Sequence, residues 1–280
     1  MINIELFRVK VFPSLQKDLF PVEFSPPLAL VAAIQSTPSA ERRKGYTWHI
    51  GNVESIDPFG MYFALGRTTI TTKALYDEAE HKFAVVADET APFTHVFCDT
   101  ALEVCGIAAQ HELAPSVGGI AHQLEELLNS TVSKSTGYRF EVSAIRDPTD
   151  FLEIIQRAYA VMRFAVTFSL PNAFDAKEDL QAPVERYAKE ARARKGILQV
   201  SGPDLNKTVV ETVARAAAAG GNEATAVIRT TKKAKPVKRS IKGNPASLKE
   251  SDDVTSNQQK RSILDGVRNL YGRIKRGDGA

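Results

Sequence analysis

Between residues 137 and 230, apolar residues switch between the two-residue spacing of strands and the three-to-four-residue spacing of helices. Alternation indicates strands at 138–145, 163–170, 197–201 and 224–230. Helical spacing covers 151–158, 180–191 and 205–217. If the middle helix is an insertion, the order βαβ(α)βαβ predicts a ferredoxin-like α/β sandwich, with helices on one face of a four-stranded sheet.

Before residue 137 the pattern is mainly that of short strands separated by polar or Pro/Gly turns. The strand candidates are 2–12, 46–56, 59–72, 82–87, 94–98 and 102–108. Helical spacing occurs only at 28–34 and at 116–128, and residues 36–45 have the composition of a surface loop. We therefore expect an N-terminal antiparallel α+β domain, 1–136, in which a β-meander is covered by a helix, followed by the ferredoxin-like domain, 137–230.

After Thr230 large apolar residues become sparse, and the segment 231–260 is polar and basic. Such a segment buries too little apolar surface to offset its chain entropy, so we expect a disordered basic linker. Residues 261–280 regain helical spacing and predict an amphipathic docking helix that begins with a capping box at Ser262. Its apolar stripe, the expected partner-docking surface, consists of Ile263, Leu264, Val267, Leu270, Tyr271 and Ile274.

The charge of the chain is divided unevenly. Residues 231–280 hold thirteen of the 36 Lys/Arg and five of the 33 Asp/Glu, so this tail has a net charge of +8 and the remainder −5. A basic tail on an acidic body suits DNA or RNA bound without sequence preference, although a solubilising or folded-back tail is an alternative. The candidate nucleic-acid-binding residues are Lys232, Lys233, Lys235, Lys238, Arg239, Lys242, Arg273, Lys275 and Arg276.

No catalytic motif stands out. The chain has no P-loop, no GxGxxG after a strand, no Gly-x-Ser-x-Gly elbow and no CxxC pair. Cys98 and Cys105, with His95 and His111 nearby, favour buried free thiols over a zinc site, and the His122 to Glu126 helical turn favours a solvated face. We predict no catalytic residue, no metal ligand and no cofactor, and enzymatic activity is undecided but disfavoured.

The favoured hypothesis is a non-enzymatic binding or accessory protein. It engages nucleic acid through the basic tail, and a protein partner or a second copy through its body or terminal helix. One alternative is a metal-dependent nuclease or hydrolase that uses the carboxylates between Asp77 and Glu89. Another is a structural protein whose tail helix docks on itself or on a membrane.

The sequence also bears on location. It contains no apolar run of 18 residues, and Met1-Ile2-Asn3-Ile4-Glu5 lacks the features of a signal peptide. We therefore expect a cytoplasmic protein without stable membrane insertion.

Overall fold

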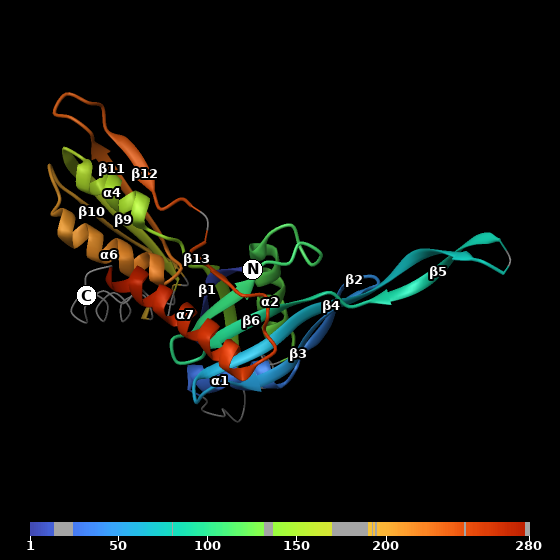
Figure 1. Cartoon of the computed structure of the whole chain (residues 1–280). Coiled ribbons are helices and arrows are strands. Elements are labelled where there is room, and N and C mark those ends of the chain that lie inside the picture. Colours follow the sequence, from blue (N-terminus) through green and yellow to red (C-terminus); the bar gives the residue numbers. More distant parts are fainter. Residues whose placement is uncertain are drawn as a thin grey trace.

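The structure of the chain is a computed structural model (Figure 1) that describes residues 1–13, 25–79, 81–131, 137–169, 190–191, 193, 195–243 and 245–277. Its architecture is mixed α+β, as the sequence predicts, with a nine-stranded and a four-stranded sheet. Both sheets are built from antiparallel pairs.

The large sheet contains most of the N-terminal half. Its strands are β1 (Ile2–Pro13), β2 (Ser39–Arg43), β3 (Tyr46–Ser55), β4 (Gly60–Asp77), β5 (Lys82–Thr90), β6 (Phe93–Asp99), β7 (Val104–Ala108), β8 (Tyr138–Ala144) and β13 (Ser247–Glu250). Their order is β13-β1-β7-β6-β4-β3-β2, with β8 also beside β1 and β5 beside β4. It is not a simple meander, because β1 pairs with β7 and β4 pairs with β6 in its first half and β5 in its second.

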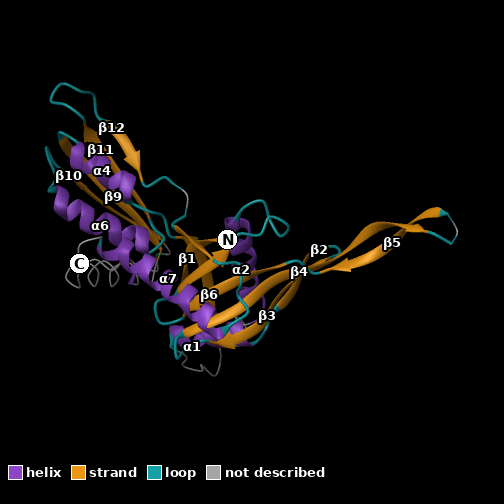
Figure 2. Ribbon diagram, viewed as in Figure 1, coloured by secondary structure: helices purple, strands orange, loops and turns teal. Residues whose placement is uncertain are grey.

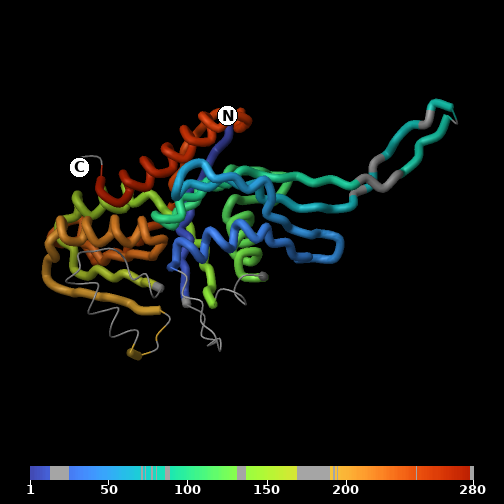
Figure 3. Tube along the Cα trace, turned by 90° about the horizontal axis from the view of Figure 1, so that it is seen from below, coloured from blue at the N-terminus to red at the C-terminus, as the bar shows by residue number. Residues whose placement is uncertain are grey.

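The second half of β4 and its partner β5 leave the body as a long two-stranded ribbon (Figures 1 and 3). We call residues 69–90 the arm. The sequence predicts its two strands, although it ends them too early, at residues 72 and 87.

The small sheet has the order β10-β9-β11-β12 and belongs to the C-terminal half. Its strands are β9 (Ala160–Ser169), β10 (Lys195–Ser201), β11 (Glu223–Arg229) and β12 (Val237–Ser240). Buried side chains such as Phe164, Val166 and Ala226 form its inner face. The helices α4 (Thr149–Arg157) and α6 (Lys207–Ala219) cover that face, and we call the other face, which no described helix covers, the open face.

Both faces of the large sheet are covered. The period of two along β1 sends Phe7 and Val9 toward α1 (Pro26–Gln35) and α2 (Val117–Thr131), which form one core with them. Ile4 and Leu6 point the other way, toward α7 (Asn257–Arg276). Because α7 also packs on α6, one continuous core joins the two sheets (Figure 2).

The ferredoxin-like arrangement predicted for 137–230 is not what the structure has. β8, its expected first strand, pairs with β1 along Phe7 to Pro13 and so belongs to the large sheet. Phe140 and Val142 of β8 donate their backbone N–H groups to the side chains of Asn129 and Glu125 on α2. β8, which follows the predicted boundary at 136/137, thus pairs with a strand that precedes it. Alternation along β8 indicates one buried face, but it does not say against which sheet that face is buried.

The segment 231–260, predicted to be a disordered linker, is structured where it is described. β12 pairs with β11 and β13 pairs with β1, and the three residues Ile241, Ala246 and Val254 between and after them are buried. The segment is poor in apolar residues, but its backbone forms hydrogen bonds with strands of the two sheets, and these bonds order it. The segment thus contributes one strand to each sheet.

Three smaller differences concern element ends. β2 lies within residues 36–45, which the sequence predicts to be a loop. α7 begins at Asn257 rather than near Ser262, because Ser256 accepts a hydrogen bond from the backbone of Gln259 and caps the helix. The helix predicted at 180–191 lies almost entirely outside the described residues.

Candidate nucleic-acid interface

The basic segment after Thr230 forms the turn and second strand of the hairpin β11–β12. β11 is held between β9 and β12 by backbone pairing, and its inward residues Ala224, Ala226 and Ile228 are buried. The hairpin, which we define as residues 223–242, is therefore fixed to the core on one side. Its connecting turn, 230–236, projects at the end of the molecule farthest from the arm (Figure 1).

Six cationic side chains of the hairpin are exposed. They are Lys232, Lys233, Lys235, Lys238, Arg239 and Lys242. None of them forms a hydrogen bond or an ion pair with a residue that the structure describes. The structure thus gathers six of the nine predicted nucleic-acid-binding residues on one ordered element.

The positive charge continues across the open face of the small sheet. Strand register puts Lys238 opposite Val227, and Val227 opposite Arg163, so these three side chains share that face. Two strand spacings separate Lys238 from Arg163, about 10 Å. Arg163 is exposed.

Tyr159 is a candidate residue that sequence reasoning missed. Its backbone N–H donates to the carbonyl oxygen of Arg229, the last residue of β11, at 2.8 Å, and its side chain is 53% exposed. An exposed aromatic ring beside cationic side chains is the combination on which single-stranded bases stack. The only sequence signal was an aromatic residue at the junction between a helix and a strand, which is too common to be specific.

The remaining predicted cations, Arg273, Lys275 and Arg276, lie in the last turn of α7. This end of the helix packs near α6, since a Cβ on Gly277 would lie 3.3 Å from Cζ of Arg215. The C-terminal end of α7 and the hairpin turn are well separated in Figure 1. The structure therefore does not bring the two groups of basic residues together.

The predicted partner-docking stripe of α7 lies inside the molecule. Ile263, Leu264, Val267, Tyr271 and Ile274 are buried, and Leu270 is partly buried against the same core. In addition, Arg268 binds two carboxylates, with Nη1 2.7 Å from Oδ2 of Asp57 and Nε 2.6 Å from Oδ2 of Asp99. These hydrogen bonds lower the pKa of Asp57 and raise that of Arg268. None of the described helices is long and apolar enough to span a membrane.

A second polar cluster lies under the start of α7. Nζ of Lys260 is 2.7 Å from Oε2 of Glu54 and 4.4 Å from the ring centre of Tyr62, whose hydroxyl lies 2.9 Å from Nδ1 of His95. Burial and the charge of Lys260 lower the pKa of His95. The four side chains contact one another in sequence and so join α7 to β3, β4 and β6.

Lys10 of β1 is the most deeply buried cation. Its Nζ donates to Oδ1 of Asn222 at 3.0 Å and lies 3.5 Å from Oε1 of Glu141. Burial lowers the pKa of Lys10. Because Asn222 precedes β11, this contact positions the basic hairpin relative to the large sheet.

The carboxylates between Asp77 and Glu89 are spread along the arm. Strand register pairs Asp77 with Lys82 and Asp88 with Thr71. Six residues of β4, about 20 Å, therefore separate the two aspartates along the ribbon. The side chains of Asp77, Glu80 and Asp88 lie outside the described ones, and the extended backbone between Asp77 and Asp88 keeps these two residues apart.

Two other metal candidates have structural contacts instead. Cys98 and Cys105 are free thiols, buried directly opposite each other on β6 and β7, and their mutual hydrogen bond raises the pKa of Cys98. His122, Glu125 and Glu126 place ligand atoms within 4.8 Å of one another. However, Glu125 accepts the N–H of Val142 at 2.8 Å, and Glu126 pairs with Arg42.

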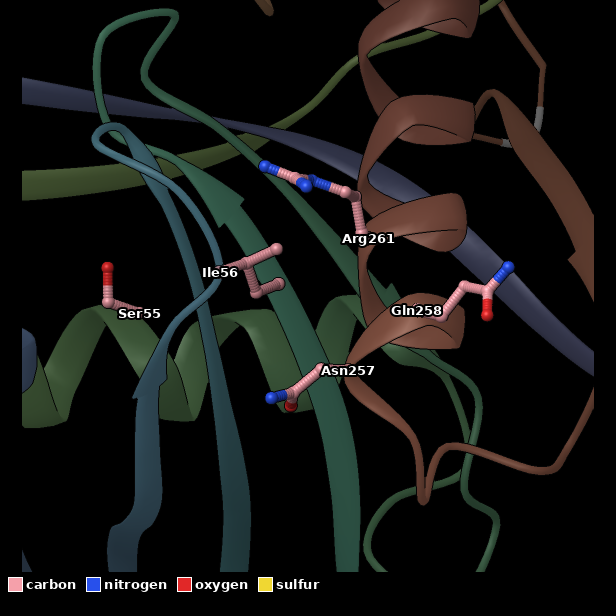
Figure 4. Close-up of a pocket in the computed structure, with 5 residues that line it drawn as sticks. All are labelled: Ser55, Ile56, Asn257, Gln258 and Arg261. Carbon is pink, nitrogen blue, oxygen red and sulfur yellow. The ribbon is translucent and has the colours of Figure 1, made fainter.

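A pocket of about 230 Å³ lies between the β3–β4 turn and the start of α7 (Figure 4). Its lining residues are Ser55, Ile56, Asn257, Gln258 and Arg261. None of these five supplies a carboxyl, thiol or imidazole group, so the pocket offers no general acid or base near neutral pH.

The sequence matches no known family model and no curated protein.

Proposed function

We propose that this chain is a non-enzymatic nucleic-acid-binding protein in which the β11–β12 hairpin holds the phosphate backbone. The observation that carries the proposal is the set of six exposed cations on the hairpin, none of them paired within the described part of the chain. By contrast, Arg268 and Lys260 of the same basic tail are paired with carboxylates of the body. The hairpin charges are therefore the ones available to an external anion.

The mode of binding follows from the residue types. Lysines on a turn neutralise phosphates and release counterions, which gives strong salt dependence and little base readout. Tyr159 adds an exposed aromatic side chain at the end of β11, next to the turn that carries the lysines, and a ring of this kind stacks only on unpaired bases. We therefore propose preferential binding of single-stranded DNA or RNA without sequence preference.

An ordered hairpin also lowers the entropic cost of binding. A disordered basic tail must give up chain entropy when it meets phosphate, whereas the backbone of β12 is already held by β11. The proposal includes a cytoplasmic location, where nucleic acid is present and thiols such as Cys98 and Cys105 stay reduced.

The test is equilibrium binding of the full chain to a labelled 20-nucleotide single strand and to the corresponding duplex. One variant replaces Lys232, Lys233, Lys235 and Lys238 with Gln. A control replaces Arg273, Lys275 and Arg276, the exposed cations at the end of α7, with Gln. We expect the hairpin variant to lose on the order of 100-fold or more in affinity, because each neutralised phosphate contributes through counterion release, and the control to lose little. Wild-type affinity in the hairpin variant would refute the proposal.

A further inference from the structure

The arm is an amphipathic ribbon with its apolar face in solvent. Register pairs Ala74 with Val85 and Tyr76 with Phe83, so these residues share one face, together with Ile70. The exposed fractions of Ile70, Tyr76, Phe83 and Val85 are 71%, 49%, 81% and 71%. The rings of Tyr76 and Phe83 contact each other with centroids 5.0 Å apart.

A ribbon of this kind has no core of its own. From Ile70 to Glu89 the two strands pair only with each other within the described chain, and no described helix covers them (Figures 1 and 3). Two-stranded hairpins are marginally stable alone, and contiguous exposed apolar surface marks an interaction site. We therefore expect the apolar face of the arm to pack against a surface of another molecule.

The charge of the arm indicates which surface that is. The sequence from Ile70 to Glu89 has a net charge of −3, with the acidic residues Asp77, Glu78, Glu80, Asp88 and Glu89 and the basic residues Lys73 and Lys82. A matching surface is flat, partly apolar and basic. The net negative charge of the arm also repels the arm of a second copy, which disfavours arm-to-arm pairing.

The open face of the small sheet meets these requirements. It carries Ile197, which is 69% exposed, and Val227, and it is flanked by Arg163, Lys238 and the rest of the basic hairpin. Two sheets pack face to face when one presents an apolar strip to the other. The acidic rim of the arm then meets the basic rim of the small sheet.

The arm and this face lie at opposite ends of the molecule (Figure 1), so a chain cannot use its own arm. We propose that the arm of one copy docks on the open face of the small sheet of a second copy, head to tail. Such a contact is heterologous, and repeated copies build a ring or a filament. The assembly shares the basic surface with nucleic acid but does not depend on nucleic-acid binding.

The test is sedimentation velocity of the full chain without nucleic acid, from 1 to 100 μM at low salt. The arm variant is Phe83→Ser with Val85→Ser, and the acceptor variant is Arg163→Glu with Lys238→Glu. We expect concentration-dependent assemblies for the wild type and monomers for each variant alone. A 1:1 mixture of the two variants keeps one intact arm and one intact acceptor, and so forms dimers that grow no further.

Each other outcome overturns the proposal. A wild type that stays monomeric throughout means that the arm serves a different protein. Wild-type assembly in the arm variant means that copies associate through another surface. Assembly of the acceptor variant alone means that arms pair with arms, and monomers in the mixture mean that the arm does not bind the acceptor face. Thermal unfolding of each variant checks that the body is intact, and nucleic-acid binding by the arm variant tests the proposed function separately.

Discussion

Arg268 of α7 holds Asp57 of the β3–β4 turn through two hydrogen bonds, Nη1 to Oδ2 at 2.7 Å and Nη2 to Oδ1 at 3.1 Å. The two residues are 211 positions apart in the sequence. The pair fastens the C-terminal helix to the body, so the part of the basic tail that was expected to dock on a partner stabilises the fold instead.

We therefore predict that Arg268→Met destabilises the protein. The substitution leaves Asp57 and Asp99, whose side chains are 11% and 5% exposed, without their cation. Breaking a largely buried pair in this way costs roughly 3 kcal/mol, measurable by urea unfolding. Arg261→Met, an exposed position on the same helix, is the control and should change stability by less than about 0.5 kcal/mol. Equal stability of the two variants would contradict the structural role of Arg268.

A second prediction concerns the packing of α7 on the large sheet. A Cβ at Gly106 of β7 would lie 2.6 Å from Cγ2 of Val267 and 2.8 Å from Cγ2 of Ile4. Gly106→Ala should therefore force the helix away from the sheet and cost about 1–3 kcal/mol in the free energy of unfolding. Gly51→Ala in β3 meets no atom within 4 Å and is the matched control. A neutral Gly106→Ala would mean that α7 does not lie against β7.

Stability should also depend on pH through His95. Its pKa is lowered in the fold, first by burial and then by Lys260, whereas in the unfolded chain it titrates near 6.5. The unfolded state thus binds more protons just below pH 6.5, and stability falls as pH falls through that window. Melting temperatures between pH 7.5 and 5 should decline less steeply for His95→Gln than for the wild type. The exposed His122→Gln is the control, and parallel curves for all three proteins would refute the assignment.

Tyr159 gives a prediction about the kind of nucleic acid that is bound. Tyr159→Ala should weaken single-strand binding by about 1–3 kcal/mol, because a stacking surface is lost, and should leave duplex binding unchanged. Phe59→Ala, an aromatic residue of similar exposure on the β3–β4 turn, should change neither. An equal loss for both substrates would indicate that Tyr159 acts on the hairpin rather than on bases.

The sequence predicted most elements of the large sheet because runs of branched and aromatic residues alternate with polar or Pro/Gly turns. β3, β6 and α2 begin and end within about three residues of their predicted bounds. The sequence did not predict which strands pair with one another. The alternation in β8 would be the same if it paired with β9. The pattern alone therefore does not identify β1 as its partner.

The tail was predicted less well for a related reason. Composition indicates how much apolar surface a segment can bury. It does not indicate which strands have unpaired edges with which the segment can pair. β12 and β13 are four residues each and become ordered because β11 and β1 offer unpaired backbone groups. The charges of the candidate site were visible in the sequence, but their division into paired cations such as Lys260 and exposed ones such as Lys238 required the fold.

The central claim is that the hairpin cations contact phosphates. The most direct measurement is the slope of log K against log salt for a duplex, compared between the wild type and the variant that replaces Lys232, Lys233, Lys235 and Lys238 with Gln. Each lost phosphate contact lowers the slope by about 0.9, so the account predicts a slope that is shallower by up to about 3.6. An unchanged slope would show that these lysines touch no phosphate, and would contradict the account.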